Sequence, residues 1–260
     1  MISIIIVNYH SEKYLIKCLY SIYKHSFKED FEIIVVNNDQ KDKIKELIQK
    51  FPEVKIYQNE KNLGFGAGNN VGARIAKGDI LLFLNPDTEI ISKNIEDIFS
   101  LFQKNDKLGI IGSQLWLDDN KIQPWSVGYE ISLLNLIKNN LGLTSGQNIW
   151  QAKEKVEADW VSGAALFIRK DTFEKTGGFD EKFFMYFEDM DLCKRVRARG
   201  NIILYNPNFK VRHIGGRSYP EKNFQKKDYY KAQEYYFKKH RNFFEWLLIK
   251  MLGKLFYANH

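Results

Sequence analysis

The densest group of reactive side chains in the sequence is Glu188-Asp189-Met190-Asp191, which directly follows the aromatic run 183–187. Aromatic neighbours exclude water from a carboxylate, and this raises its pKa and its strength as a base. Such a carboxylate suits general-base catalysis, in which it takes the proton of an attacking hydroxyl group. The pattern also fits the acidic start of a helix, which the helix dipole stabilises. The two interpretations are compatible.

A further carboxylate ends the apolar run 80–84, in the order Asn85-Pro86-Asp87. Magnesium and manganese ions prefer oxygen ligands and are often held by one or two carboxylates together with substrate phosphates. Asp87 is therefore a candidate metal ligand. The alternative is that it caps the next helix, a common role for aspartate.

A histidine with a glycine-rich turn behind it forms the next candidate, His213-Ile214-Gly215-Gly216-Arg217-Ser218. A histidine after a strand is usually structural. The two glycines and the arginine favour a contact with a ligand or a phosphate group instead.

The segment 62–70 carries three glycines at alternate positions and several amide side chains. Glycine allows tight turns and a close approach to a ligand, and the first amides of a following helix can bind a diphosphate. The spacing differs from the dinucleotide fingerprint and from the phosphate loop, so a plain glycine-rich turn is the alternative. The residues in question are Asn62, Gly64, Gly66, Gly68 and Asn69.

Four short apolar runs, at 3–7, 31–36, 54–57 and 80–84, must position these groups. Their continuous Ile, Val and Leu content is typical of parallel strands that are covered on both faces. Helical stripes lie between them, one with Leu15, Leu19 and Ile22 and another with Ile44, Leu47 and Ile48. This alternation predicts a doubly wound α/β domain over about the first 110 residues.

Polar residues follow each of the four runs. In open α/β sheets ligands bind outside the carboxyl ends of the strands, so we expect a donor-binding edge there. The side chains that these strand ends bring to the edge include Asn8, Tyr9, Asn37, Asp39, Asn62 and Asn85.

Composition limits the class of protein. The chain has 260 residues, 44% of them hydrophobic, which is enough for one large domain or for one domain with an appendage. Cys18 and Cys193 match no metal-ligand spacing, and Met1 leads directly into a strand rather than a signal peptide, so we expect a cytoplasmic protein. Residues 205–260 hold twelve Lys or Arg and four Asp or Glu, a local net charge of +8. An anionic partner or a solvated helical face would both explain this charge.

In this order and spacing, the motifs resemble the inverting nucleotide-sugar glycosyltransferases of the GT-A fold, the family 2 type, and most of all their rhamnosyltransferase-like branch. The resemblance rests on the segments 4–9, 62–72, 85–87, 160–165, 184–191 and 213–218. It implies a Rossmann-like, mostly parallel sheet flanked by helices in a catalytic domain over 1–218. Residues 1–110 would form the nucleotide-binding half and 111–218 the acceptor-binding half, followed by a helical appendage at 219–260.

The resemblance also implies roles. Asp189 would be the general base of a single displacement, with Glu188 and Asp191 supporting it or contacting the acceptor. Asp87 and His213 would hold Mg²⁺ or Mn²⁺ near the donor diphosphate, with Arg217 as a further contact to the charge. The turn that shapes the acceptor side would contain Trp160, Ser162, Gly163 and Ala164.

One position departs from the family pattern, because Asn37 replaces the aspartate that contacts the nucleobase. An amide oxygen can still accept a hydrogen bond from a pyrimidine, but it carries no charge. Asn37 therefore leaves the base of the nucleotide-sugar donor open. The resemblance implies either dTDP-rhamnose, from the branch, or a UDP-hexose as the donor. The acceptor would be a hydroxyl of a cell-surface glycan or a lipid-linked oligosaccharide. A non-catalytic nucleotide- or glycan-binding protein is the alternative, ahead of a sugar nucleotidyltransferase.

The apolar segment 241–256 is too short and too interrupted to span a bilayer, which takes about 20 apolar residues. Its flanking lysines fit peripheral contact with the inner face of the cytoplasmic membrane, and packing on the domain or on a second subunit is the alternative. No nucleic-acid reading motif accompanies the basic tail, so we expect no nucleic-acid partner.

Overall fold

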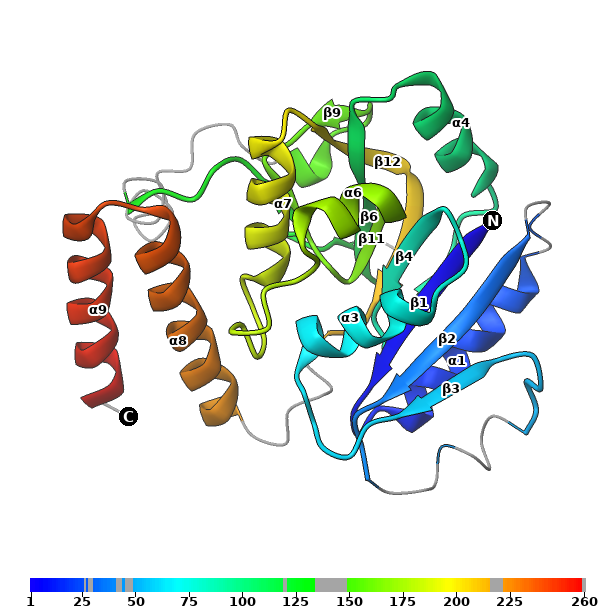
Figure 1. The fold of residues 1–260 in the computed structure, drawn as a ribbon, viewed down its shortest axis with the longest axis horizontal. Helices are drawn as coiled ribbons and strands as arrows, with labels where there is room; N and C mark the ends of the chain where they lie inside the picture. Colours follow the sequence, from blue (N-terminus) through cyan, green and yellow to red (C-terminus); the bar gives the residue numbers. More distant parts are fainter. Residues whose placement is uncertain are drawn as a thin grey trace.

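The four apolar runs form adjacent parallel strands at one end of a ten-stranded sheet (Figure 1). They correspond to β1 (Ile2–Asn8), β2 (Phe31–Asn37), β3 (Lys55–Gln58) and β4 (Ile80–Leu84). β1 pairs in parallel with both β2 and β4, and β2 pairs in parallel with β3. The computed structural model describes residues 1–25, 27, 30–40, 44, 49–118, 121–133, 149–215 and 222–258.

The second half of the chain extends the same sheet. The strand order is β3-β2-β1-β4-β11-β6-β12-β5, with β7 and β9 paired to its side. The added strands are β5 (Thr88–Ile90), β6 (Leu108–Asp118), β7 (Lys121–Ile122), β9 (Val156–Glu157), β11 (Ala165–Arg169) and β12 (Ile202–His213). A separate two-stranded ribbon joins β8 (Val127–Gly128) to β10 (Trp160–Val161). β12 is one continuous strand with a register shift between Asn206 and Lys210.

Helices cover both faces of the sheet at β1, β2 and β4, as their continuous apolar content predicts. The edge strand β3 is exposed along its whole length, so the prediction of cover on both faces is wrong for the run 54–57. On one face Ile4 and Ile6 pack against α1 (Glu12–Lys24) and α4 (Glu96–Lys104). On the other face Ile5 and Val7 belong to the core that includes α3 (Phe65–Ile75), α6 (Lys170–Thr176) and α7 (Glu188–Ala198). The predicted stripe of Leu15, Leu19 and Ile22 is buried in α1. Of the second stripe, Ile44 is buried, and Leu47 and Ile48 lie outside the described residues.

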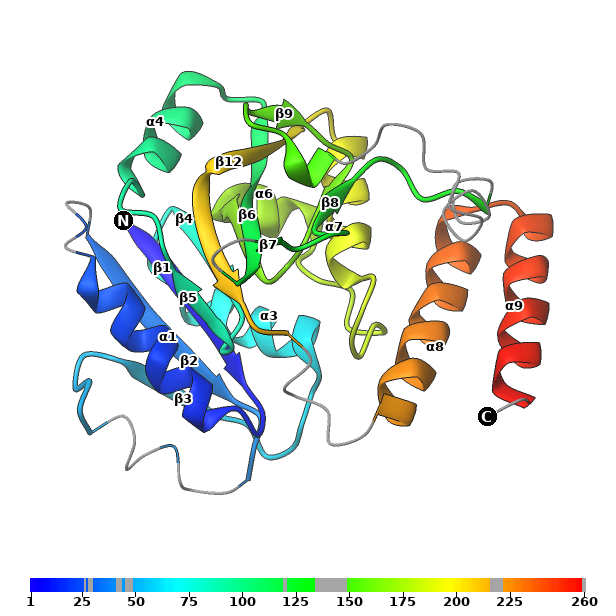
Figure 2. The ribbon, with the colours of Figure 1, turned by 180° about the vertical axis from the view of Figure 1, so that it is seen from behind.

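The C-terminal appendage is a helical hairpin, α8 (Lys222–His240) and α9 (Phe243–Ala258), which stands at the end of the molecule opposite β3 (Figure 2). A third cluster of buried side chains joins it to the segment before α7, with Phe183 and Phe187 packed against Tyr236, Phe237 and Ile249. The expected α/β fold with a C-terminal helical appendage is therefore confirmed. Within the described ranges no helix combines the length and the apolar content that crossing a bilayer requires.

Candidate active site

A cavity of about 790 Å³ opens where the carboxyl ends of β1, β2 and β4 meet the start of α7. One side is lined by Tyr9, Asn38, Asn62 and Gly64, and the strand end at Asn85–Asp87 continues it. The other predicted groups that line it include Glu188, Asp189, Trp160, Ser162, Gly163, Ala164 and His213. The fold thus brings residues more than 120 positions apart to one cavity, as the motif order implied.

Asp87 and His213 lie together at this cavity, both nearly buried. His213 Nε2 is 3.4 Å from Asp87 Oδ1 and 3.3 Å from Asn85 Nδ2. His213 Nδ1 lies 2.8 Å from Gln123 Oε1, which can only accept a hydrogen bond, so Nδ1 carries the hydrogen. Nε2 then accepts from Asn85 Nδ2 and lies beside the Asp87 carboxylate, and a metal-bound histidine likewise needs a ring nitrogen without hydrogen.

The chemistry of this corner fits a divalent cation. Asn85 Oδ1 is buried without a hydrogen-bond partner, beside the Asp87 carboxylate and the His213 ring. Oxygen and imidazole ligands suit manganese and magnesium. Among the described residues that line the cavity there is no lysine or arginine, whereas Asp87, Glu130, Glu188 and Asp189 are acids. A diphosphate in the cavity would therefore need positive charge from another source. Arg217 lies outside the described residues.

Glu188 and Asp189 begin α7 and face the cavity from the opposite side. Two bulky residues in the left-handed region, Tyr186 at φ 70° and Phe187 at φ 66°, turn the chain into this helix. The Gly163 N–H donates to Asp189 Oδ2 and the Met190 N–H donates to Asp189 Oδ1, both at 2.8 Å. Backbone strain of this kind is concentrated at functional sites, where the surrounding structure holds it in place.

Burial gives the two carboxyls different properties. Burial raises the pKa of Asp189, although the N–H groups of Gly163 and Met190 act against this change. Burial and the neighbouring charge of Asp189 raise the pKa of Glu188 well above its ordinary value, and Glu188 Oε2 is buried without a partner. The two backbone donors favour the ionised form of Asp189, whereas burial disfavours the ionised form of Glu188 more strongly. Asp189 is therefore the better placed of the two to accept a proton.

Asp191 lies off the cavity. Its fully buried carboxylate is 2.8 Å from Arg195 Nε, and 2.6 Å from both Lys239 Nζ and His240 Nε2. Burial alone would raise the pKa of Asp191, but His240, Arg195 and Lys239 outweigh it and lower this pKa. We therefore interpret Asp191 as the group that fixes α8 to α7, rather than as a group that contacts substrate.

The glycines of 64–68 serve packing inside the protein. A Cβ atom on Gly64 would lie 2.2 Å from Phe184 O, and the Phe65 N–H donates to that oxygen at 3.0 Å. A Cβ on Gly68 would lie 2.9 Å from Val7, in β1. Of the three glycines only Gly64 lines the cavity. The run therefore lets α3 approach β1 and the turn before α7, and only its first residue is placed as the diphosphate hypothesis required.

The amides at the ends of β1 and β2 bond mainly to one another. Asn37 is fully buried, and its Oδ1 accepts from Asn8 Nδ2 at 2.9 Å. Its Nδ2 donates to Asp39 O and to Gln58 Oε1, both at 2.8 Å. Neither Asn8 nor Asn37 lines the cavity, and a nucleobase could bond to Asn37 only by replacing one of these partners. Asn69 behaves similarly, since its Nδ2 donates to Phe65 O within α3.

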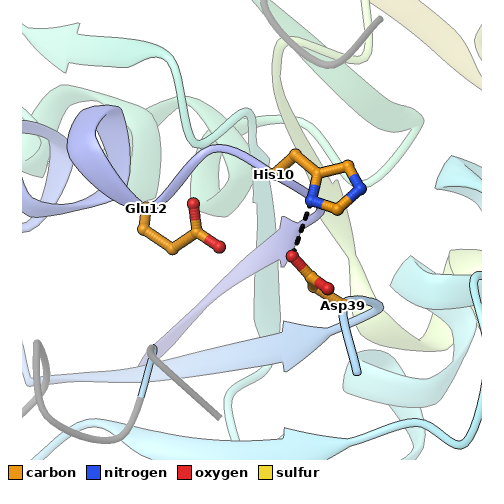
Figure 3. Close-up of side chains that lie close together, drawn as sticks. All are labelled: His10, Glu12 and Asp39. Carbon is orange, nitrogen blue, oxygen red and sulfur yellow. Dashed lines mark ion pairs between the residues drawn. The ribbon is translucent and has the colours of Figure 1, made fainter. Parts of the chain in front are cut away.

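Next to this network lies a cluster that the sequence patterns did not single out (Figure 3). Ligand atoms of His10, Glu12 and Asp39 lie within 4.8 Å of one another. His10 Nδ1 is 2.7 Å from Asp39 Oδ2, and the His10 ring is 4.1 Å from the ring of Tyr9, which lines the cavity. No spacing rule joins residues 10 and 39, because the cluster arises from the pairing of β1 with β2.

The far wall of the cavity is aromatic. Beside the predicted Trp160 it includes Trp125, Trp150, Tyr129, Tyr186 and Tyr229. The hairpin α8–α9 holds part of this wall in place. Arg241 Nε donates to Ile131 O at 2.9 Å, and Glu245 Oε2 accepts from the Leu133 N–H at 3.3 Å. The sequence between 115 and 159 lacks periodicity, so its scattered tryptophans gave no signal for this wall.

Comparison with known proteins agrees with the geometry. Residues 3–171 match the family model described as glycosyl transferase family 2. The chain is 28% identical over 243 residues to "Rhamnosyltransferase WbbL" of Escherichia coli K12, covering 86% of this chain and 89% of that protein. It is 26% identical over 189 residues to the "N-acetylglucosaminyl-diphospho-decaprenol L-rhamnosyltransferase" of Mycobacterium tuberculosis. That match covers 64% of this chain and spans only 60% of the length of the mycobacterial relative.

Solved structures share the fold. The mannosyltransferase PcManGT of Pyrobaculum calidifontis, solved with GDP-Man and Mn²⁺, is similar with a TM-score of 0.65 at 13% identity. The match covers 92% of this chain and 63% of that one. At this level of identity the likeness establishes the GT-A arrangement of the sheet and helices.

Proposed function

The chain belongs to glycosyl transferase family 2, and from this premise we propose that it is an inverting, metal-dependent hexosyltransferase. It would move a sugar from a nucleoside-diphosphate donor to a hydroxyl of a lipid-linked or cell-surface glycan. The observation that carries the proposal is the position of Asp189. This half-buried carboxylate is oriented by two backbone N–H groups and lines the same cavity as Asp87 and His213.

The reaction follows from these positions as a single displacement. Asp189 accepts the proton of the acceptor hydroxyl as its oxygen attacks the anomeric carbon of the donor sugar. The bond from that carbon to the diphosphate breaks, and the diphosphate leaves with the electron pair on the opposite face, so the configuration inverts.

Asp87 and His213 would hold Mg²⁺ or Mn²⁺, with Asn85 Oδ1 as a further oxygen ligand. When bound, the metal supplies positive charge for the departing diphosphate. Gln123 keeps the Nε2 atom of His213 free for this role through its bond to Nδ1.

The donor and acceptor classes rest on the relatives. Two of them are named as rhamnosyltransferases, and the name of one gives a lipid diphosphate that carries N-acetylglucosamine as its acceptor. We propose dTDP-rhamnose or a UDP-hexose as the donor, and a lipid-linked sugar as the acceptor. Because Asn37 is already hydrogen-bonded inside the protein, we expect weaker selection for the base than a free carboxylate would give.

A screen of UDP, dTDP, GDP and ADP by thermal shift, each with and without Mn²⁺, tests the proposal first. A nucleotide that binds the folded state raises the melting temperature by mass action. Metal-dependent stabilisation by one nucleotide, followed by release of that nucleotide from its sugar conjugate, is the expected result. If no nucleotide stabilises the protein with metal present, the transferase proposal fails.

We also propose that α9 contacts the inner face of the cytoplasmic membrane. Its outer surface exposes an apolar stripe, consisting of Phe243, Phe244, Leu247, Leu248, Met251 and Leu252, with Phe244 80% exposed. Lys238 and Lys250 lie over the ring of Trp246 beside this stripe, which suits an anionic lipid surface.

The membrane proposal is tested by sedimentation with phosphatidylglycerol vesicles and with phosphatidylcholine vesicles. Substituting Phe244→Ser together with Met251→Ser should abolish binding to the anionic vesicles. The double substitution is preferable to deletion of α9, because deletion would also remove the hydrogen bond from the Leu133 N–H to Glu245. Vesicle binding that this double substitution does not change would exclude the proposal. Loss of a dimer in its place would assign the stripe to a second copy of the chain.

A further inference from the structure

Trp125 is the most exposed aromatic side chain of the cavity wall, with 51% of its surface accessible. Its ring lies 5.0 Å from that of Trp150, which is 8% exposed, at an interplanar angle of 45°. The buried ring of Trp150 thus packs against the exposed ring of Trp125. An exposed aromatic face in the wall of a cavity is a surface on which a ligand can pack.

The backbone of this residue is held in an unfavourable conformation. Trp125 has φ 59°, in the left-handed region that a bulky side chain rarely adopts. Hydrogen bonds fix the turn around it. Ser126 Oγ donates to Gln123 O at 3.0 Å, and the Gln123 N–H donates to Leu115 O at 2.8 Å. The position of the ring is therefore set by the fold before any ligand binds.

The same turn connects to both sides of the reaction. The Ser162 N–H donates to Ser126 O at 2.9 Å, and the next residue, Gly163, donates its N–H to Asp189. Gln123, two residues before Trp125, bonds to His213. Two hydrogen bonds therefore join the turn to Asp189, the proposed base. One hydrogen bond joins it to His213, which lies beside Asp87 at the proposed metal site.

We propose that Trp125 is the surface on which a sugar ring of the acceptor stacks, so that one of its hydroxyls meets Asp189. This inference rests on the proposed function. One face of a pyranose presents C–H groups, and these are attracted to the electron-rich face of an indole. The rest of the wall suits a sugar better than a lipid chain, because Tyr129 and the Glu130 carboxylate line it beside Trp125. The sugar that stacks on Trp125 is thus a pyranoside, one face of which presents C–H groups and no hydroxyl group or other substituent.

The position of Trp125 in the wall favours the acceptor over the donor. The strand ends contribute Tyr9, Asn38 and Asn62 to the lining of the cavity, whereas Trp125 belongs to its aromatic wall. From Trp125 the wall continues through Tyr129 and Ile131 to α8, and thus to the hairpin that carries the exposed apolar stripe. An acceptor bound along this wall has its sugar near the base and its lipid toward α9.

Three variants test the proposal. Trp125→Gly removes the ring and also relieves the left-handed strain, so it should fold well. Trp125→Phe keeps an aromatic face at the same position. Tyr20→Ala is the matched control, because Tyr20 is 53% exposed, lies on α1 and does not line the cavity.

The probe acceptor is a short-chain N-acetylglucosaminyl diphospho-lipid, joined by a panel of octyl glucoside, galactoside, rhamnoside and N-acetylglucosaminide. We expect Trp125→Gly to raise the acceptor KM by about tenfold or more, with kcat changed by less than about threefold. Trp125→Phe should restore most of the affinity, and Tyr20→Ala should match the wild type. Nucleotide affinity and the slow hydrolysis of donor without acceptor should stay unchanged in all three.

An unchanged acceptor KM in Trp125→Gly would overturn the proposal. So would an equal loss of nucleotide affinity or of donor hydrolysis, because the ring would then serve the donor. If the wild type hydrolyses donor but neither binds nor glycosylates any pyranoside of the panel, the stacking surface is wrong and the transferase assignment stands. If the wild type binds no nucleotide, the proposed function itself fails.

Discussion

Asp189 and Asp191 are two residues apart on α7, and their replacement by asparagine should give opposite results. Asp189→Asn should strongly reduce turnover and leave the fold nearly unchanged. Asp191→Asn should destabilise the fold and leave the chemistry of the folded protein nearly unchanged. The contrast follows from where the carboxylates point, one into the cavity and the other toward Arg195, Lys239 and His240.

The size of the Asp191 effect can be estimated from its surroundings. Removing one partner of a buried ion pair costs about 3–5 kcal/mol, because the remaining charge stays buried without compensation. The lower end applies here, since the side chains of Arg195 and Lys239 are 21% and 26% exposed and can turn toward water. A loss of about 3 kcal/mol lowers the melting temperature of a chain of this size by about 6–12 °C.

For Asp189→Asn the same reasoning gives a small change in the free energy of unfolding. The asparagine oxygen can keep one of the two backbone hydrogen bonds, and the loss of the other is offset by the removal of a desolvated charge. We expect a change in stability within about 1 kcal/mol. The rate should fall by about 10²–10⁴, the usual contribution of a general base, with nucleotide affinity retained.

Thermal unfolding and single-turnover sugar transfer, both measured on both variants, decide the matter. The transfer assay is run well below the melting temperature of Asp191→Asn, so that the folded fraction is complete. If Asp191→Asn melts with the wild type and loses turnover, its carboxylate acts on substrate and our account of the α7–α8 contact is wrong. If Asp189→Asn keeps the wild-type rate, another group is the base.

Three further outcomes follow from the site. Because the pKa of Glu188 is raised, the folded state holds its proton more tightly than the unfolded state, so stability falls as the pH rises through the raised pKa. The unfolding free energy of Glu188→Gln, relative to that of the wild type, should therefore increase from pH 5 to pH 8, by at most about 1.4 kcal/mol for each unit of pKa shift, measured by denaturant titration. The same difference between variant and wild type at pH 5 and at pH 8 would contradict this. Gly64→Ala should lower the free energy of unfolding by about 2–4 kcal/mol, because its new Cβ would clash with Phe184 O and because alanine is strained at φ 85°. A melting temperature close to that of the wild type would refute the close approach. Gln123→Ala should weaken Mn²⁺ activation by about 10–100-fold through the loss of the His213 contact, seen in the metal concentration that gives half-maximal rate; an unchanged value would separate His213 from the metal.

Regular patterns in the sequence were sufficient for the sheet and for the order of the motifs. The runs that form β1, β2 and β4 are largely buried, as their continuous Ile, Val and Leu content predicts, and β1 to β4 pair in parallel as predicted. The edge strand β3 is exposed, because it has a strand neighbour on one side only. Asp87, His213 and Asp189 meet at one cavity because each follows or precedes an element whose end lies at the same edge of the sheet.

The remaining features depend on partners that are distant in sequence, so local patterns could not show them. The glycines at 64 and 68 are explained only by Phe184 and Val7, which a glycine-rich run does not name. Asp191 looks like a third catalytic acid until His240 and Lys239 of α8 are brought beside it. Trp125 lies in a stretch without periodicity, and its left-handed backbone has no sequence signal of the kind that glycine provides.

The pairing of β5 with β12 sets the order in which the enzyme can mature during synthesis. β5 begins immediately after Asp87, and in the described sheet its strand partner is β12, with Thr88 opposite His213. The Ile214 N–H also donates to Asp87 O. A nascent chain that has not yet emerged beyond residue 214 can form β1 to β4 but leaves β5 and Asp87 without the contacts to β12. The parallel strands β1 to β4 can thus form early on the ribosome, whereas Asp87 and His213 come together only after this long-range contact closes.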